Sequence, residues 1–105
     1  MRILVLSNMY PPHHLGGYEL SCRDVMERLR ARGHDVSILT TTMRLPGVSD
    51  APDESARDVR RSLTFYWEDH RIRNPSIVSR VRMEKSNHAV LRSVLASFRP
   101  DVVSV

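Results

Sequence analysis

Two glycines, Gly16 and Gly17, stand between a short apolar run at residues 3–6 and a segment whose apolar residues recur at helical spacing from Tyr18 onward. The pair therefore lies at the expected start of a helix. Helix N-termini carry positive potential and free backbone N–H groups, so they bind anions such as phosphate. Glycine lets a ligand approach the backbone, where a side chain would block it. We expect a phosphate or substrate site here, the alternative being that the pair only forms a tight turn into the helix.

Polar side chains beside the pair could contact the same ligand. Glu19 could bind sugar hydroxyls, or it could only complement the helix dipole. His14 could hydrogen-bond a substrate hydroxyl or phosphate, or it could be a polar loop residue like its neighbour His13. Adjacent histidines point in different directions in an extended loop, and no nearby Cys, His or Asp set completes a tetrahedral site. We therefore expect no metal.

Two common nucleotide-binding patterns do not fit. The P-loop needs Gly-Lys-Ser/Thr at the helix start, where residues 16–19 read Gly-Gly-Tyr-Glu. The dinucleotide fingerprint needs an acidic residue at the end of the second strand, where residues 40–42 are all threonine. An NAD-dependent oxidoreductase is disfavoured, and we expect no cofactor.

The expected elements alternate strand and helix. Residues 3–6 are apolar at consecutive positions, which is typical of a strand buried on both faces of a parallel sheet. Gly33 is a natural stop for the first helix, and Ser76 is a suitable N-cap for a long second helix. The other predicted elements are strands at 36–41, 59–67 and 101–105, loops at 43–55 and 68–75, and the long helix at 77–98, closed by Pro100. The apolar helix faces are predicted to be Tyr18, Cys22, Val25, Met26 and Leu29, then Ile77, Val81, Leu91, Val94, Leu95 and Phe98.

Length and composition indicate one small domain. The chain has 105 residues, a net charge of +4 and a single cysteine, Cys22, which excludes an intramolecular disulfide. The apolar run at 3–6 is too short for a signal-peptide core, and no segment is long enough to span a membrane. We expect a cytoplasmic protein. The basic residues Arg71, Arg73, Arg80, Arg82 and Lys85 are either a solvated face or a peripheral membrane contact. The aromatic residues 65–67 lack the spread of an RNA-stacking platform, so we expect no nucleic acid partner.

Several motifs resemble one family. The Tyr-Pro-Pro loop at 10–12, Gly16 and Gly17, the Arg-Gly-His-Asp-Val turn at 32–36 and the threonines at 40–41 resemble the N-terminal domain of GT-B glycosyltransferases, in particular the retaining family 4 (group 1) type. Phe-Arg-Pro-Asp-Val-Val at 98–103 resembles that family's helix into its fourth strand. The resemblance implies an α/β fold with a Rossmann-like parallel sheet and flanking helices. Residues 1–105 would be the acceptor-side portion of that domain, truncated, with the donor-binding C-terminal domain absent.

The resemblance implies a glycosyltransferase that moves a sugar from a nucleotide-sugar donor to an acceptor, without a metal. Gly16 and Gly17 would line the cleft, with Tyr18, Glu19 and His14 beside them. The family often has a small residue and a histidine after the glycine pair, where this chain has Tyr18 and Glu19. The fragment alone is expected to be inactive and to self-associate through uncovered apolar surface. The alternative is a non-catalytic Rossmann-like module that binds a nucleotide or phosphate, or serves in protein interaction.

Overall fold

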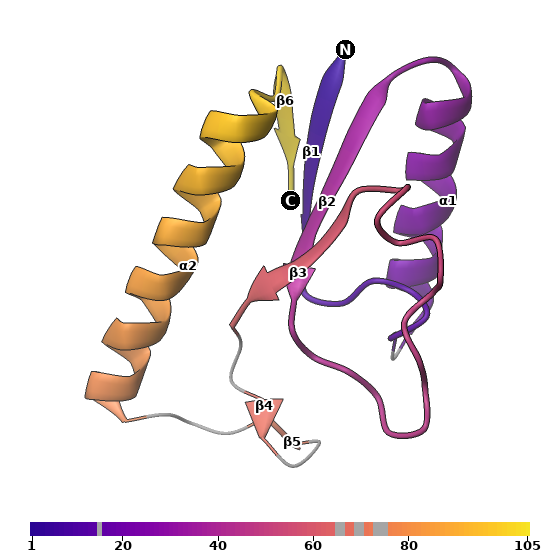
Figure 1. Ribbon diagram of the computed structural model, residues 1–105. Coiled ribbons are helices and arrows are strands. Elements are labelled where there is room, and N and C mark those ends of the chain that lie inside the picture. The colour runs from indigo at the N-terminus through magenta and orange to yellow at the C-terminus, as the bar shows by residue number, and fades with distance from the viewer. Residues whose placement is uncertain (15, 65–66, 69–70, 73–75) are drawn as a thin grey trace.

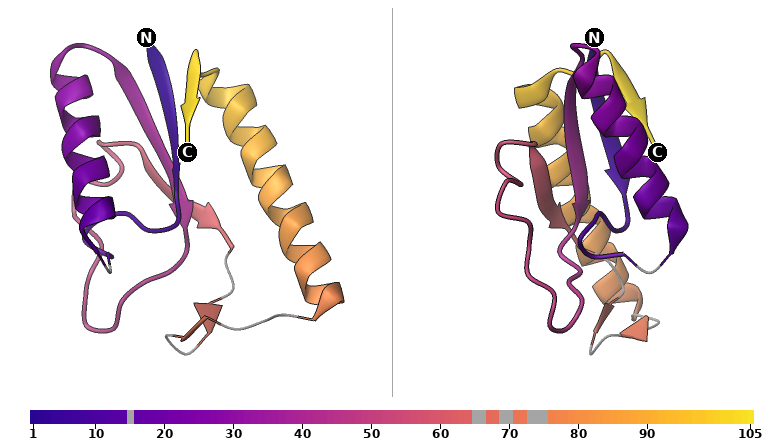
Figure 2. Two further views of the ribbon diagram at one scale, coloured as in Figure 1. Left: turned by 180° about the vertical axis from the view of Figure 1, so that it is seen from behind. Right: turned by 90° about the vertical axis from the view of Figure 1, so that its right-hand side faces the viewer.

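The computed structural model describes residues 1–14, 16–64, 67–68, 71–72 and 76–105 (Figure 1). Four parallel strands form one sheet in the order β3-β2-β1-β6, and β4 and β5 form a separate antiparallel pair. The sheet lies between α1 on one face and α2 on the other, as both views of Figure 2 show. The elements are β1 Arg2–Ser7, α1 Gly17–Ala31, β2 Asp35–Thr41, β3 Val59–Leu63, β4 Trp67–Glu68, β5 Arg71–Ile72, α2 Ile77–Phe98 and β6 Val102–Ser104.

The central strand β1 supplies both halves of the core, because alternate residues of a strand point to opposite faces. Ile3 and Val5 pack with Met26 of α1, and Leu4 packs with Val94 and Phe98 of α2. A strand between two helical layers needs apolar residues at consecutive positions, which is the pattern that predicted it. The predicted α/β, Rossmann-like parallel sheet is confirmed.

Local signals account for the helix ends. Gly33 follows the C-terminus of α1 with φ of +90°, a conformation that glycine adopts without steric cost. The Ser76 hydroxyl accepts a hydrogen bond from the backbone N–H of Ser79, which caps α2 as predicted. Cys22 is partly buried against the core on the α1 side, and burial raises the pKa of its thiol.

The predicted helix faces were wrong at several positions. Tyr18 and Val25 are 67% and 50% exposed on α1. On α2, Ile77, Val81 and Leu95 are exposed, and only Val94 and Phe98 are buried. For Ile77 and Val81 the reason is that the first turns of α2 extend beyond the ends of the sheet strands, where the sheet has no surface to cover them (Figures 1 and 2).

The third strand is shorter than predicted. It ends at Leu63, because its partner β2 ends at Thr41 and the two residues pair directly. The predicted loop at 68–75 instead contains part of the short β4–β5 pair, in which Trp67 is opposite Ile72 and Glu68 is opposite Arg71. Residues 65 and 66 of the predicted strand, and 69–70 and 73–75 of the predicted loop, lie outside the described residues. In the described part of the chain, no helix combines the length and the apolar character that crossing a membrane requires.

The end of α2 gives a stability prediction. Arg99, the C-cap residue, has φ of +51° and ψ of +65°, a left-handed conformation that is costly for a residue with a Cβ. We expect Arg99→Gly to raise the free energy of unfolding by about 1 kcal/mol. Urea unfolding measures the change. Arg92→Gly, inside the same helix, is the matched control and should lower it by about 1 kcal/mol. If both substitutions change the free energy of unfolding in the same direction, this account of the cap is contradicted.

Candidate functional site

The topology selects one edge of the sheet as the place for a ligand. All four strands are parallel, so their carboxyl ends meet at one edge. From β1 the chain proceeds to β2 and β3 on one side and then crosses to β6 on the other. This reversal of strand order is a topological switch point, and open α/β sheets bind ligands in the crevice outside the strands at such a point.

A small pocket lies at this switch point. It has a volume of about 180 Å³ and is lined by Leu6, Ser7, Asn8, Tyr18, Leu63 and Val105. Tyr18 belongs to the first turn of α1, so the helix start and the end of β1 meet here. The structure therefore brings the predicted Tyr18 to the carboxyl edge. Ser7 and Asn8 line the same pocket and were missed by the sequence analysis.

Nothing in the fold itself requires glycine at the start of α1. Gly16 is the N-cap, with extended backbone angles (φ −152°, ψ −176°) that other residues adopt. Among the described residues, and apart from its chain neighbours, a Cβ at Gly17 would meet no atom within 4 Å, and one at Gly16 would meet only Glu19 Oε2 at 3.8 Å. The space beside both residues is open. The arrangement can therefore accept a group that approaches the backbone closely.

Glu19 already occupies part of this helix end. The backbone N–H of Gly16 donates a hydrogen bond to Glu19 Oε2 at 3.2 Å, one half of a capping box. This is the dipole-complementing role that the sequence analysis left open for Glu19. Because its carboxylate is negative, it opposes the binding of an anion at the same terminus.

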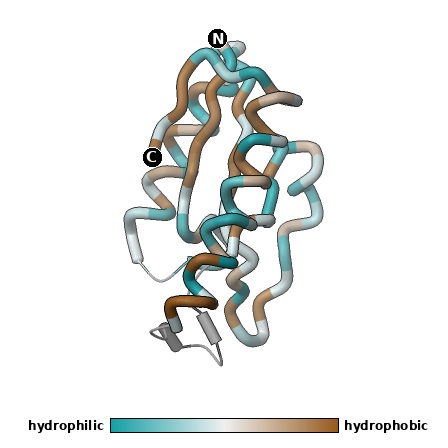
Figure 3. Tube along the Cα trace, turned by 90° about the vertical axis from the view of Figure 1, so that its left-hand side faces the viewer, coloured by the Kyte–Doolittle hydropathy of each residue, from teal (hydrophilic) through white to brown (hydrophobic). Residues whose placement is uncertain are grey.

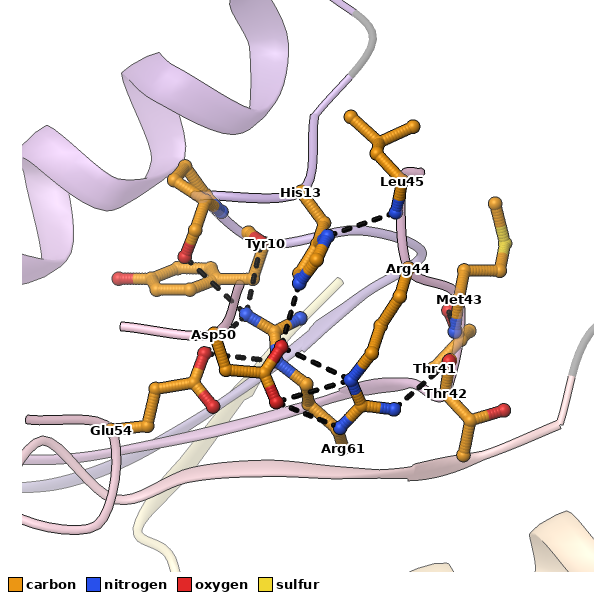
Figure 4. Close-up of polar contacts among 11 residues, drawn as sticks. Tyr10, His13, Thr41, Thr42, Met43, Arg44, Leu45, Asp50, Glu54 and Arg61 are labelled. Carbon is orange, nitrogen blue, oxygen red and sulfur yellow. Dashed lines mark hydrogen bonds and ion pairs between the residues drawn. The ribbon is translucent and has the colours of Figure 1, made fainter. Parts of the chain in front are cut away.

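The two histidines have different environments. The side chain of His13 is 0% exposed, whereas His14, a predicted site residue, is partly buried in the same loop. His13 Nδ1 accepts a hydrogen bond from the backbone N–H of Leu45 at 2.9 Å, and Nε2 lies 2.6 Å from Asp50 Oδ1 (Figure 4). Since Nδ1 accepts, the proton is on Nε2, which donates to the carboxylate. His13 is a polar loop residue, as predicted, but it is fully buried and joins the loop after β1 to the loop after β2.

A buried arginine makes a second connection between the loops. The side chain of Arg61, on β3, is 3% exposed. Its Nη2 donates to Glu54 Oε1 at 2.5 Å and to the carbonyl oxygen of Tyr10 at 3.2 Å (Figure 4). Arg44 holds Asp50 from the outer side, its Nε lying 3.0 and 3.1 Å from the two carboxylate oxygens. Together these contacts hold the backbone of residues 10–13 against the β2–β3 loop.

Two ionisable groups at this end of the sheet have shifted pKa values. The hydrogen bond from Arg44 lowers the pKa of Asp50 to about 2, assisted by His13 and opposed by burial. Burial, assisted by the nearby charge of Glu27, raises the pKa of Tyr10 to about 12, so its hydroxyl stays protonated at neutral pH. The Asp50 carboxylate stays ionised and keeps both loops joined.

A larger hollow of about 360 Å³ lies between α1 and residues 51–59. Its central cation, Arg57, is paired with Glu27 at 2.6 Å and with Asp53 at 2.5 Å. These ion pairs connect the β2–β3 loop to α1, and we assign them a structural role. In the described part of the chain, no three His, Cys, Asp or Glu side chains gather closely enough to hold a metal ion.

Comparison with known proteins gives one finding. The family model of the glycosyl transferase 4-like domain matches residues 16–105, which include the glycine pair and most of the sheet. Comparisons with curated proteins and with solved structures give no match.

The Asp50 contacts predict a pH dependence of stability. The folded-state pKa of about 2 lies below the ordinary 3.8, so Asp50 stabilises the fold fully above pH 3.8 and loses this contribution as pH falls through about 2. We expect the difference in unfolding free energy between wild type and Asp50→Asn to shrink between pH 4 and pH 2. Urea unfolding across this range measures it.

Arg44→Met tests whether Arg44 causes the lowered pKa of Asp50. Since Arg44 contributes most to the shift, the pH-dependent part of the Asp50→Asn effect should diminish in this background. Stability curves for wild type and Asp50→Asn that stay parallel down to pH 2 would contradict the assignment.

Proposed function

The chain belongs to the glycosyl transferase 4-like domain family, and we propose that it is the acceptor-side, N-terminal part of a glycosyltransferase that uses a nucleotide-sugar donor. In this proposal the enzyme is of the retaining GT-B type and acts in cytoplasmic carbohydrate metabolism. A second α/β domain would supply the main donor contacts and face the carboxyl edge of this sheet. The single observation that carries the proposal is the open helix start at Gly16 and Gly17, beside the switch-point pocket.

The chemistry follows from the direction of the helix. Sugar transfer from a nucleotide-sugar releases a nucleoside diphosphate, so negative charge grows on the leaving phosphate in the transition state. The first N–H groups of a helix have no intrahelical partners, and the start of α1 at Gly17 has open space beside it. Hydrogen-bond donors whose interaction with the phosphate strengthens as charge develops lower the activation barrier of transfer. Equal binding of the ground state and the transition state does not lower it.

The neighbouring side chains have separate roles in this proposal. Gly16 and Gly17 admit the phosphate or the acceptor to the backbone. Tyr18 contacts the acceptor from the switch-point pocket, which it lines. His14 and Glu19 hydrogen-bond sugar or acceptor hydroxyls, since a carboxylate is a strong acceptor for O–H donors.

A bulky side chain at Gly17 tests the proposal. The gene should be read past the codon for Val105, its complete product expressed, and transfer measured from UDP-glucose and GDP-mannose. We expect Gly17→Val to reduce transfer about 100-fold, because its side chain would keep the phosphate from the backbone N–H; this is the loss typical of one oxyanion donor that no longer reaches its acceptor. Ala31→Val, at the exposed far end of α1, adds similar bulk and should leave transfer unchanged.

The outcomes separate the two readings of this site. Equal transfer by wild type and Gly17→Val would remove the glycine pair from the mechanism. Binding of a nucleotide-sugar without any transfer by the complete product would instead favour the non-catalytic binding module. Circular dichroism of each variant checks that the fold is retained.

Glu19 permits a second test on this chain alone. Glu19→Gln keeps an oxygen to accept the Gly16 N–H but removes the charge that opposes an anion. We expect pyrophosphate to bind this variant about two- to fivefold more tightly in calorimetry, which is the usual size of one charge near a helix end. Asp24→Asn, an exposed change on the same helix, is the control. Equal pyrophosphate affinity for wild type and Glu19→Gln would show that no anion binds at this helix end.

A further inference from the structure

An apolar pocket lies on the α2 side of the sheet. It has a volume of about 350 Å³, and four leucines contribute most of its wall: Leu6, Leu39, Leu63 and Leu91. Glu84, Asn87 and His88 of α2 complete it. Leu39 is fully buried, but the other three leucines are only partly covered. The pocket therefore offers apolar surface to a ligand at the carboxyl half of the strands.

The angle of α2 explains why this surface is open. Phe98 and Val94, near the C-terminus of α2, are buried against Leu4 and Leu39. Toward its N-terminus the helix leaves the sheet (Figures 1 and 2). Asn87 fixes that separation, because its side-chain amide bonds both the carbonyl oxygen and the N–H of Thr64, at 2.8 and 2.7 Å. The helix is thus held in a position that leaves the leucines half covered.

The apolar pocket adjoins the switch-point pocket. Leu6 and Leu63 line both of them. The polar groups of Ser7, Asn8 and Tyr18 belong to one pocket, and the four leucines belong to the other. A molecule that fills both needs a polar end and an apolar end.

The apolar surface continues outward along α2. Ile77, Val81, Glu84 and His88 follow one another at spacings of four, three and four residues, which places them on one face of the helix. Ile77 and Val81 are 81% and 46% exposed, and brown hydrophobic segments alternate with teal hydrophilic ones along the first turns of α2 in Figure 3. Exposed Arg82 and Lys85 lie beside them. A helix with exposed apolar and basic residues is typical of the membrane interface, where molecules with alkyl chains reside.

We propose that the acceptor of this enzyme is an amphiphile, whose hydroxyl-bearing head lies in the switch-point pocket and whose alkyl chain enters the leucine pocket. This inference rests on the proposed transferase function. A wholly polar acceptor would leave the leucine surface in contact with water, whereas each buried methylene of a chain contributes favourably to binding. The alkyl chain of the acceptor then leaves the leucine pocket along Ile77 and Val81 of α2.

The test uses this chain with alkyl glucosides of increasing length. Methyl, hexyl and octyl β-D-glucoside are titrated below their micelle concentrations, and the leucine methyl groups are observed by NMR. We expect affinity to rise roughly fourfold per added methylene until the pocket is full. The shifts should concentrate on Leu6, Leu39, Leu63 and Leu91. Equal binding of methyl and octyl glucoside, or shifts elsewhere, would overturn the proposal.

A variant at the pocket mouth makes the test specific. His88 is exposed and lines the pocket, so His88→Trp should cover the mouth and weaken octyl glucoside binding at least tenfold. Arg92→Trp, exposed one turn further along α2, should bind as wild type does. Leu91→Phe fills the pocket from inside and should weaken binding in the same way; normal binding by both pocket variants would refute the assignment.

The two proposals can fail separately. If octyl glucoside binds at the leucines and the complete gene product transfers no sugar, the pocket assignment is supported and the transferase function is contradicted. If sugar is transferred and the alkyl chain length of the glucoside has no effect on binding, the amphiphilic acceptor is contradicted and the transferase function is supported.

Discussion

The candidate site depends on how two loops are held at the carboxyl edge of the sheet. The described residues 8–14 and 42–58 lie outside the helices and strands, so their backbone groups need other partners. Buried His13 and Arg61 provide these partners across the edge, with Asp50 and Glu54 as their counterparts. Removing one member of the Arg61–Glu54 pair would cost about 3–5 kcal/mol, because the other charge is left unpaired. The backbone of residues 10–13 is therefore held at the carboxyl edge of the sheet.

Most of the fold was predictable because its signals are local. Residues 3–6 are apolar at consecutive positions, which is typical of a strand covered on both faces, and Gly33 and Ser76 mark helix ends through their own backbone or side chain. The apolar helix faces were predicted less well. Periodicity shows which side of a helix is apolar, but it does not show how far the partner surface extends. Ile77 and Val81 lie on an apolar face that continues past the end of the sheet.

The same distinction applies to the site. The predicted glycine pair lies at the helix start, and the Gly16–Glu19 hydrogen bond spans three residues, within reach of a sequence pattern. The His13–Asp50 contact spans 37 residues and the Arg61–Tyr10 contact spans 51. No spacing rule joins such residues, since they meet only after three strands have paired. A charged residue in a strand pattern, as Arg61 is, was the one available signal that a buried partner existed.

The helix start alone would not supply the affinity that the proposed donor binding needs. A helix N-terminus contributes about 0.3–1 kcal/mol toward an anion, and the Glu19 carboxylate opposes even this. Micromolar binding of a nucleotide-sugar requires about 8 kcal/mol. Most of that energy has to come from groups outside this helix end. In a two-domain transferase, the second domain would supply them. In such an enzyme the value of the open glycines lies in the transition state. As negative charge grows on the leaving phosphate, the hydrogen bond that each exposed N–H donates to it becomes stronger than the one to the bound donor.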